Sequence, residues 1–201
     1  MKKARIAVLV SGGGTNLQAL IDAERAGALP SGELALVVSS KAGVFALERA
    51  AAAGIPAVVI SRRDLGSPEA FEDALLSALR EAGIDLVVLA GFLSILGPRV
   101  IAAYPDRILN VHPSLIPSFC GAGFYGLRVH EAALSYGVKV TGATVHLVNE
   151  IPDGGRILLQ RAVEILDGDT PETLQRRVME EAEWKLLPAA TEMVARALIN
   201  D

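Results

Sequence analysis

The chain has 201 residues, of which 51% are hydrophobic and 21% charged, and its formal net charge is -4. The negative charge argues against nonspecific binding to nucleic acid or to an anionic membrane, although a local basic pocket could still hold a small phosphate. We therefore expect neither of these partners. The length favours a single domain over residues 1–201.

Two further features predict a cytoplasmic protein. Cys120 is the only cysteine, so no internal disulfide can form and a reducing compartment is favoured. The first three residues resemble the start of a signal peptide, but the apolar run 6–10 is too short for one and ends in glycines. We find no run long enough to cross a bilayer.

Strands and helices are predicted to alternate in the first half of the chain. Short apolar runs indicate strands, and longer segments with helical periodicity indicate helices. The expected order is strand 4–10, helix 15–26, strand 33–39, helix 45–53, strand 57–60, helix 67–82, strand 85–89, a short helix from about 98, and strand 108–111. Such alternation favours a mostly parallel sheet with helices on both faces, whose ligands bind beyond the carboxyl ends of the strands.

The pattern changes after residue 112. We expect an irregular loop over 113–126, a helix over 129–136, and strands over 138–148 and 157–165. The connection between these strands is too short for a parallel crossover, so they should form an antiparallel hairpin. A long final helix opens at Thr170 and Pro171, and Pro188 could bend it. The predicted fold is a single-domain, Rossmann-like α/β structure with a C-terminal hairpin.

The strand at 108–111 ends in two hydrogen-bonding side chains. Asn110 and His112 are two residues apart, so strand alternation puts them on one face, and Pro113 then ends the strand. This pair suits a reaction in which negative charge develops on a carbonyl oxygen, and histidine can also act as acid or base near neutral pH. An asparagine that caps a turn would explain the same residues without catalysis.

A glycine cluster, Ser11-Gly-Gly-Gly14, joins the first strand to the first helix. Glycines let the backbone approach an anion, and a helix N-terminus adds N–H donors. Leu17 stands where a dinucleotide fingerprint has its third glycine, and no Gly-Lys-Ser/Thr follows as in a nucleoside-triphosphate loop. A phosphomonoester fits best, and a plain glycine turn remains the alternative.

Asp153-Gly-Gly155 lies in the predicted hairpin loop, just after Thr144 and His146. An aspartate near a histidine would hold the imidazole cationic by raising its pKa. The tripeptide could equally be only a turn, and His146 only a hydrogen-bonded core residue. We interpret His130 as structural. The histidines and the cysteine lack the spacing of metal ligands, so no metal is predicted.

Together these motifs resemble those of the folate-dependent formyltransferase family. The matching segments are residues 11–18, 89–96, 110–117, 144–146 and 153–154, in family order along nearly the whole chain. The resemblance implies transfer of a formyl group from the cosubstrate 10-formyltetrahydrofolate to the amine of glycinamide ribonucleotide, a step of purine biosynthesis. It implies small-molecule partners only, with the enzyme a monomer or a homodimer.

The resemblance also implies a role for individual residues. It makes Asn110, His112 and Asp153 the catalytic set. The implied ligands of glycinamide ribonucleotide are Gly14, Thr15, Asn16 and Glu183. The implied contacts of the folate are Leu93, Ser94, Ile95, Leu96, Asn110, Asn149, Glu150, Ile151, Pro152 and Asp153. Thr144 and His146 would support the catalytic set.

The implied reaction is direct attack of the amine on the formyl carbon. Asn110 and a protonated His112 would stabilise the oxyanion, while Asp153 would keep His112 charged and relay a proton to the leaving nitrogen. The sequence departs from the family pattern at Thr144, where a serine is common, at Arg156, where a proline is usual, and in a longer, glycine-rich loop over 119–126. Contacts of that loop cannot be carried over.

Four other functions remain as alternatives. A tRNA formyltransferase would carry a further C-terminal domain, and a formyltetrahydrofolate deformylase an N-terminal regulatory domain; a first strand at residue 4 and an end at residue 201 favour neither. A sugar-nucleotide formyltransferase fits the glycine cluster less well. A noncatalytic phosphate-binding module would show no turnover that depends on His112.

Overall fold

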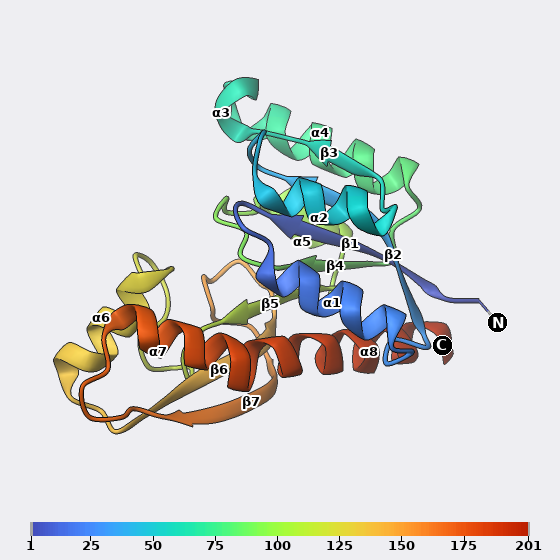
Figure 1. Cartoon of the computed structure of the whole chain (residues 1–201). Coiled ribbons are helices and arrows are strands. Elements are labelled where there is room, and N and C mark those ends of the chain that lie inside the picture. Colours follow the sequence, from blue (N-terminus) through green and yellow to red (C-terminus); the bar gives the residue numbers. More distant parts are fainter. Residues whose placement is uncertain (1, 201) are drawn as a thin grey trace.

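One seven-stranded sheet forms the centre of the computed structural model, which describes residues 2–200 (Figure 1). The strands are β1 (Ala4–Val10), β2 (Gly32–Ser39), β3 (Ala57–Val59), β4 (Leu86–Leu89), β5 (Ile108–His112), β6 (Val140–Leu147) and β7 (Ile157–Glu164). Their order is β3-β2-β1-β4-β5-β6-β7. The first five are parallel, and β6 is antiparallel to both β5 and β7. The predicted parallel sheet with a C-terminal antiparallel hairpin is confirmed.

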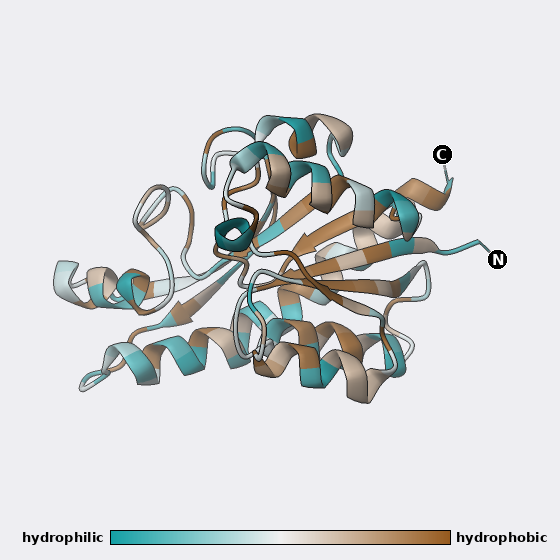
Figure 2. Ribbon diagram, turned by 90° about the horizontal axis from the view of Figure 1, so that it is seen from above, coloured by the Kyte–Doolittle hydropathy of each residue, from teal (hydrophilic) through white to brown (hydrophobic). Residues whose placement is uncertain are grey.

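Helices cover both faces of this sheet. They are α1 (Thr15–Arg25), α2 (Phe45–Ala53), α3 (Arg62–Leu65), α4 (Pro68–Glu81), α5 (Pro98–Ala103), α6 (Leu127–Tyr136), α7 (Pro171–Val178), the π-helical turn η1 (Met179–Glu183) and α8 (Trp184–Asn200). The apolar sides of α1, α2 and α8 pack on one face, and those of α4 and α5 on the other. Figure 2 shows the apolar strands enclosed between these two helical layers.

Alternation along the strands supplies both halves of the core. Val8 and Val10 of β1 belong to the cluster beneath α1 and α8, whereas Ala7 and Leu9 belong to the cluster beneath α4. All four are fully buried, because a central parallel strand has helices on each side. Within residues 2–200, no helix combines the length and the apolar character that crossing a membrane requires.

Two local features differ from the sequence predictions. The turn α3 was not expected, because one turn is too short to show helical periodicity; Ser61 caps it by accepting a hydrogen bond from the Asp64 N–H. The final helix is interrupted at η1, one turn before Pro188. The Trp184 N–H donates to the Met179 carbonyl five residues earlier, as in a π-helix, and α8 then continues through Pro188.

The sheet topology brings three loops to one edge. The strand order reverses beside β1, with β2 and β3 on one side and β4 and β5 on the other. The carboxyl ends of β1, β4 and β5 therefore meet at the switch point where parallel sheets bind ligands. The glycine cluster, residues 90–93 and His112 all lie there.

Gly142 in β6 allows a close approach of β7. A Cβ at this position would overlap the Arg161 carbonyl oxygen and press on the Leu115 side chain. We predict that Gly142→Ala lowers the free energy of unfolding by about 2 kcal/mol, because the two strands would have to separate. Urea unfolding measures this effect. Gly12→Ala is the matched control, because a Cβ at Gly12 meets nothing within 4 Å. Equal stability of the two variants would contradict the prediction.

Candidate active site

Pairing between β5 and β6 places four polar side chains on one face of the sheet. Asn110 lies opposite His146, and His112 lies opposite Thr144. Directly opposite residues of an antiparallel pair project from the same face. Asp153 reaches the same place from the loop after β6, with a left-handed backbone (φ 55°). The structure thus brings Asn110, His112 and Asp153 together.

The Asp153 carboxylate is the centre of this cluster. One oxygen, Oδ2, lies 3.5 Å from His112 Nδ1 and accepts a hydrogen bond from the Gly121 N–H at 2.8 Å. The other, Oδ1, lies 3.5 Å from His146 Nε2 and 3.4 Å from Asn110 Nδ2. Burial raises the pKa of Asp153, but the contact with His146, the Gly121 N–H and the neighbouring His112 together lower it below its ordinary value. Asp153 is therefore an anion at neutral pH.

His146 fixes the orientation of the Asn110 amide. Its Nδ1 lies 2.9 Å from the Leu147 carbonyl oxygen, which can only accept, so Nδ1 carries a proton. Its Nε2 lies 3.1 Å from Asn110 Nδ2, the atom that also donates to Asp153 Oδ1 at 3.4 Å. The amide nitrogen of Asn110, rather than its oxygen, consequently faces Asp153.

His112 is buried beside this carboxylate. Burial lowers its pKa, and the negative charge of Asp153 and the Phe119 carbonyl raise it by less, so the net pKa is below the ordinary value. The predicted upward effect of Asp153 on the His112 pKa is therefore present, but burial outweighs it. Nε2 donates to the Phe119 carbonyl oxygen at 2.8 Å. A neutral ring then turns its unprotonated Nδ1 toward Asp153.

Thr144 holds the loop that follows His112. Its hydroxyl donates to the Ser114 carbonyl at 2.7 Å and accepts from the Ile116 N–H and from Gln160 Nε2. The loop then turns at Phe119, whose φ of 50° is left-handed. These contacts bring the Phe119 carbonyl to His112 and the Gly121 N–H to Asp153.

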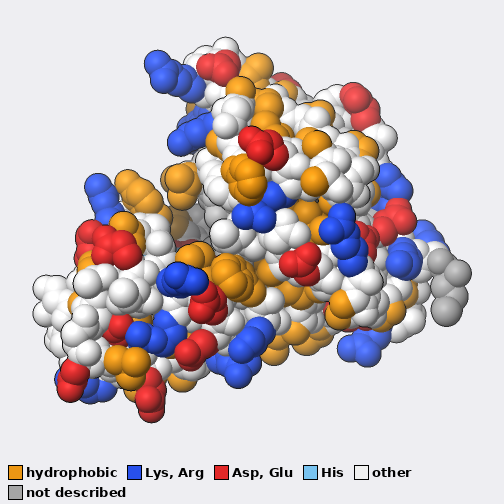
Figure 3. Space-filling view, viewed as in Figure 1, with side chains coloured by type: hydrophobic (Ala, Val, Ile, Leu, Met, Phe, Trp, Pro, Cys, Tyr) orange, Lys and Arg blue, Asp and Glu red, His pale blue; other side chains and the backbone are white. Residues whose placement is uncertain are grey.

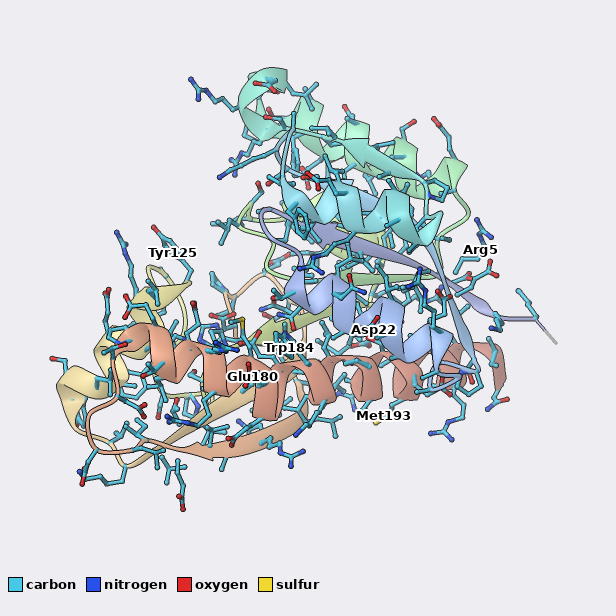
Figure 4. All side chains as sticks on the ribbon, in the orientation of Figure 1. Arg5, Asp22, Tyr125, Glu180, Trp184 and Met193 are labelled. Atoms are coloured by element: carbon cyan, nitrogen blue, oxygen red, sulfur yellow. The ribbon has the colours of Figure 1, made fainter. Side chains whose placement is uncertain are left out.

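Two cavities meet at the cluster. The first, of about 460 Å³, extends from the glycine cluster to Asn110, His112 and Asp153. The second, of about 160 Å³, is lined by residues 92–96 and 148–153 and shares Asn110 and Asp153 with the first. In Figure 3 the surface is indented between the part that carries α6 and the rest of the molecule, and Figure 4 shows Tyr125, which lines the first cavity, projecting there.

The chain matches a known family over most of its length. The sequence model described as formyl transferase covers residues 4–191. The chain belongs to the formyl transferase family. Membership of this family, which we inferred from the ordered motifs, is thereby confirmed.

Relatives of this formyl transferase include single enzymes and longer proteins. A phosphoribosylglycinamide formyltransferase of Haemophilus influenzae is 41% identical over 188 residues, which are 94% of this chain and 84% of that protein. A human trifunctional purine biosynthetic protein is 46% identical over 199 residues, but the chain spans only 19% of its length. The crystal structure of glycinamide ribonucleotide transformylase 1 from Symbiobacterium toebii has a TM-score of 0.90 at 44% identity, covering 97% of this chain and 89% of that one.

The glycine cluster and Glu183 face each other across the first cavity of the formyl transferase. Gly14 is left-handed (φ 72°) and precedes α1, and no side chain caps this helix end. Asn16 Nδ2 donates to Glu183 Oε2 at 2.7 Å. Thr15 contacts the Met179 sulfur at 3.7 Å. The π-helical turn thus carries Met179 and Glu183 to the wall of the cavity.

A serine pair that the sequence analysis missed ties three strand ends of the formyl transferase together. Ser11 Oγ, after β1, lies 2.7 Å from Ser40 Oγ, after β2, and accepts from the Leu93 N–H after β4 at 2.9 Å. Ser11 begins the glycine motif, but its contact with Ser40 leaves no signal in the sequence and depends on the strand order. Within residues 2–200, no group of three or more His, Cys, Asp or Glu side chains is arranged to hold a metal ion.

Glu183 is predicted to make stability depend on pH. Complete burial raises its pKa to about 7, although the hydrogen bond from Asn16 lowers it somewhat. The folded state therefore binds this proton more tightly than the unfolded state does, and the free energy of unfolding should fall as pH rises from about 4.5 to about 7. The full difference is about 3 kcal/mol.

Chemical unfolding of the wild type and Glu183→Gln at pH 5 and pH 8 tests this prediction. The glutamine cannot ionise, so the wild type should lose stability relative to the variant at the higher pH. Histidine titrations are common to both proteins and cancel in the difference. Parallel stability curves would show that Glu183 does not titrate in this range.

Proposed function

We propose that this chain transfers the formyl group of 10-formyltetrahydrofolate to the amine of glycinamide ribonucleotide, giving formylglycinamide ribonucleotide and tetrahydrofolate in purine biosynthesis. The observation that carries the proposal is the position of Asn110, His112 and Asp153 at the junction of two cavities. A reaction between two bound molecules needs such a junction. The names of the relatives support the same choice of substrates.

Each cavity suits one of these substrates. The phosphate of the nucleotide would lie on Gly14, Thr15 and Asn16, where an uncapped helix N-terminus presents N–H groups. Glu183 would accept hydrogen bonds from the ribose hydroxyls. The folate would occupy the second cavity, between residues 93–96 and 149–153, and its formyl group would point to Asn110.

The chemistry follows from the proton positions in the cluster. The amine attacks the formyl carbon, a C–N bond forms, and the carbonyl electron pair moves to oxygen. The Asn110 amide and the Nε2–H of His112 would stabilise this oxyanion once it replaces Asp153 and the Phe119 carbonyl oxygen as their partners. The proton from the attacking amine would pass to the pair formed by Asp153 and the bare Nδ1 of His112, 3.5 Å apart. The pair would then return it to N10 as the old C–N bond breaks.

His112 would therefore gain its charge during the reaction. Burial keeps the pKa of His112 low at the outset, and the developing oxyanion would raise it just when the proton arrives.

We further propose a cytoplasmic enzyme, monomeric or homodimeric, with no metal. Cys120 favours a reducing compartment, and direct amine attack needs no metal ion.

The proposed function predicts turnover that requires both substrates. The pure protein should change the absorbance of 10-formyltetrahydrofolate only when glycinamide ribonucleotide is also present, because the amine accepts the formyl group. Equal folate consumption without the nucleotide would indicate a deformylase. Absence of turnover with both substrates would overturn the proposal.

The proposed mechanism predicts severe effects of two substitutions. His112→Ala removes an oxyanion donor, and Asp153→Asn removes the base of the proton relay, so each should lower kcat by roughly 10²–10³-fold. Steady-state kinetics measures the loss, and circular dichroism checks that the fold is retained. Asp167→Asn is the control for the aspartate change, because Asp167 is exposed. Near-normal turnover of either active-site variant would refute its assigned role.

A further inference from the structure

The wall of the first cavity lacks an evident partner for a phosphate dianion. Among the described residues that line it there is no lysine or arginine, and Asp153 and Glu183 are both acidic. A helix N-terminus supplies only about half an elementary charge. Attraction for a phosphate must therefore depend on how the glycine N–H groups point and on charge behind the wall.

Arg49 of α2 lies directly behind the glycine cluster. Its Nε donates to the Gly13 carbonyl oxygen at 2.9 Å, and its Nη1 donates to Gln18 Oε1 at 2.8 Å. The guanidinium carbon is 4.7 Å from the centre of the Phe45 ring. A planar guanidinium held at these points has one orientation, which a lysine could not reproduce.

These contacts determine which way the glycine peptides face. In a trans peptide the C=O and the following N–H point in opposite directions. Because Arg49 holds the Gly13 carbonyl on the α2 side, the Gly14 N–H is directed away from α2. The Ala46 N–H donates to the Gly12 carbonyl at 3.2 Å and turns the Gly13 N–H the same way. A Cβ on Gly14 would overlap Ala46, so α2 packs directly against Gly14.

We propose that Arg49 is a positioning residue for the nucleotide substrate: it holds the Gly13–Gly14 peptide with its N–H toward the cavity and supplies, through that peptide, the positive charge that the cavity wall lacks. This inference rests on the proposed function to the extent that a phosphomonoester binds at the glycine cluster. Arg49 touches neither substrate and takes no part in proton transfer.

Kinetics of Arg49→Gln and Arg49→Lys test the proposal. Arg49→Gln should raise KM for glycinamide ribonucleotide roughly tenfold or more, as expected for loss of a charge-assisted hydrogen bond. The kcat and the KM for the folate should stay within about twofold of the wild type. The nucleotide KM of Arg49→Lys should lie between those of the wild type and Arg49→Gln, because lysine keeps the charge but loses one of the two contacts.

Two control variants separate this effect from others. Gln18→Ala removes the second partner of Arg49 and leaves the Gly13 contact, and Arg25→Gln removes a cation of α1 that instead contacts the Ala52 carbonyl. Both should keep KM for the nucleotide near the wild-type value. An unchanged nucleotide KM in Arg49→Gln would overturn the proposal, as would equal rises in both KM values with a lowered melting temperature.

Calorimetric titration with ribose 5-phosphate makes the result independent of turnover. The wild type should bind this phosphomonoester, and Arg49→Gln should bind it roughly tenfold more weakly. If the wild type shows no formyl transfer but this difference persists, the proposed function fails and the role of Arg49 stands. Equal affinity of the two proteins, or no binding by the wild type, would overturn the role of Arg49.

Discussion

The antiparallel register of β5 against β6 is the constraint on which the site depends. It sets Asn110 opposite His146 and His112 opposite Thr144, and a shift of one residue would turn all four side chains to the other face. The register is itself stabilised by the core, because Leu109, Val111 and Val145 between the polar residues are buried on the opposite face. The packing of apolar residues therefore determines where the polar residues meet.

The parallel half of the sheet supplies the second requirement, the proposed binding site of the nucleotide phosphate beside Asn110, His112 and Asp153. The switch in strand order next to β1 puts the glycine cluster and the end of β5 on one rim, and Ser11 joins the ends of β1, β2 and β4 by hydrogen bonds. Two halves of one sheet, parallel and antiparallel, thus each contribute one wall to the first cavity. The second cavity, which we propose binds the folate, lies where the loops after β4 and β6 meet.

Much of this arrangement could be predicted from the sequence, for identifiable reasons. Periodic and apolar segments predicted the succession of strands and helices along the chain. Asn110, His112 and Asp153 were singled out because they are side chains in motifs. The turn α3 was missed because four residues show no period. The contacts of the Phe119 carbonyl and the Gly121 N–H were missed because backbone groups leave no signal in residue identity. The lowering of the His112 pKa could not be predicted because it depends on burial, which only the folded chain defines.

Two acids of the site illustrate how surroundings and partners, rather than residue type, decide its charge. Asp153 accepts a hydrogen bond from the Gly121 N–H and lies beside two imidazoles, and its pKa falls. Glu183 has the Asn16 amide as its partner, and its pKa rises to about 7. The anion proposed for the proton relay is thus permanent near neutral pH, whereas the acid beside the proposed phosphate seat can lose its charge. A protonated Glu183 would oppose an approaching phosphate less than a carboxylate would, so the same burial that costs stability at high pH favours an anionic ligand at neutral pH.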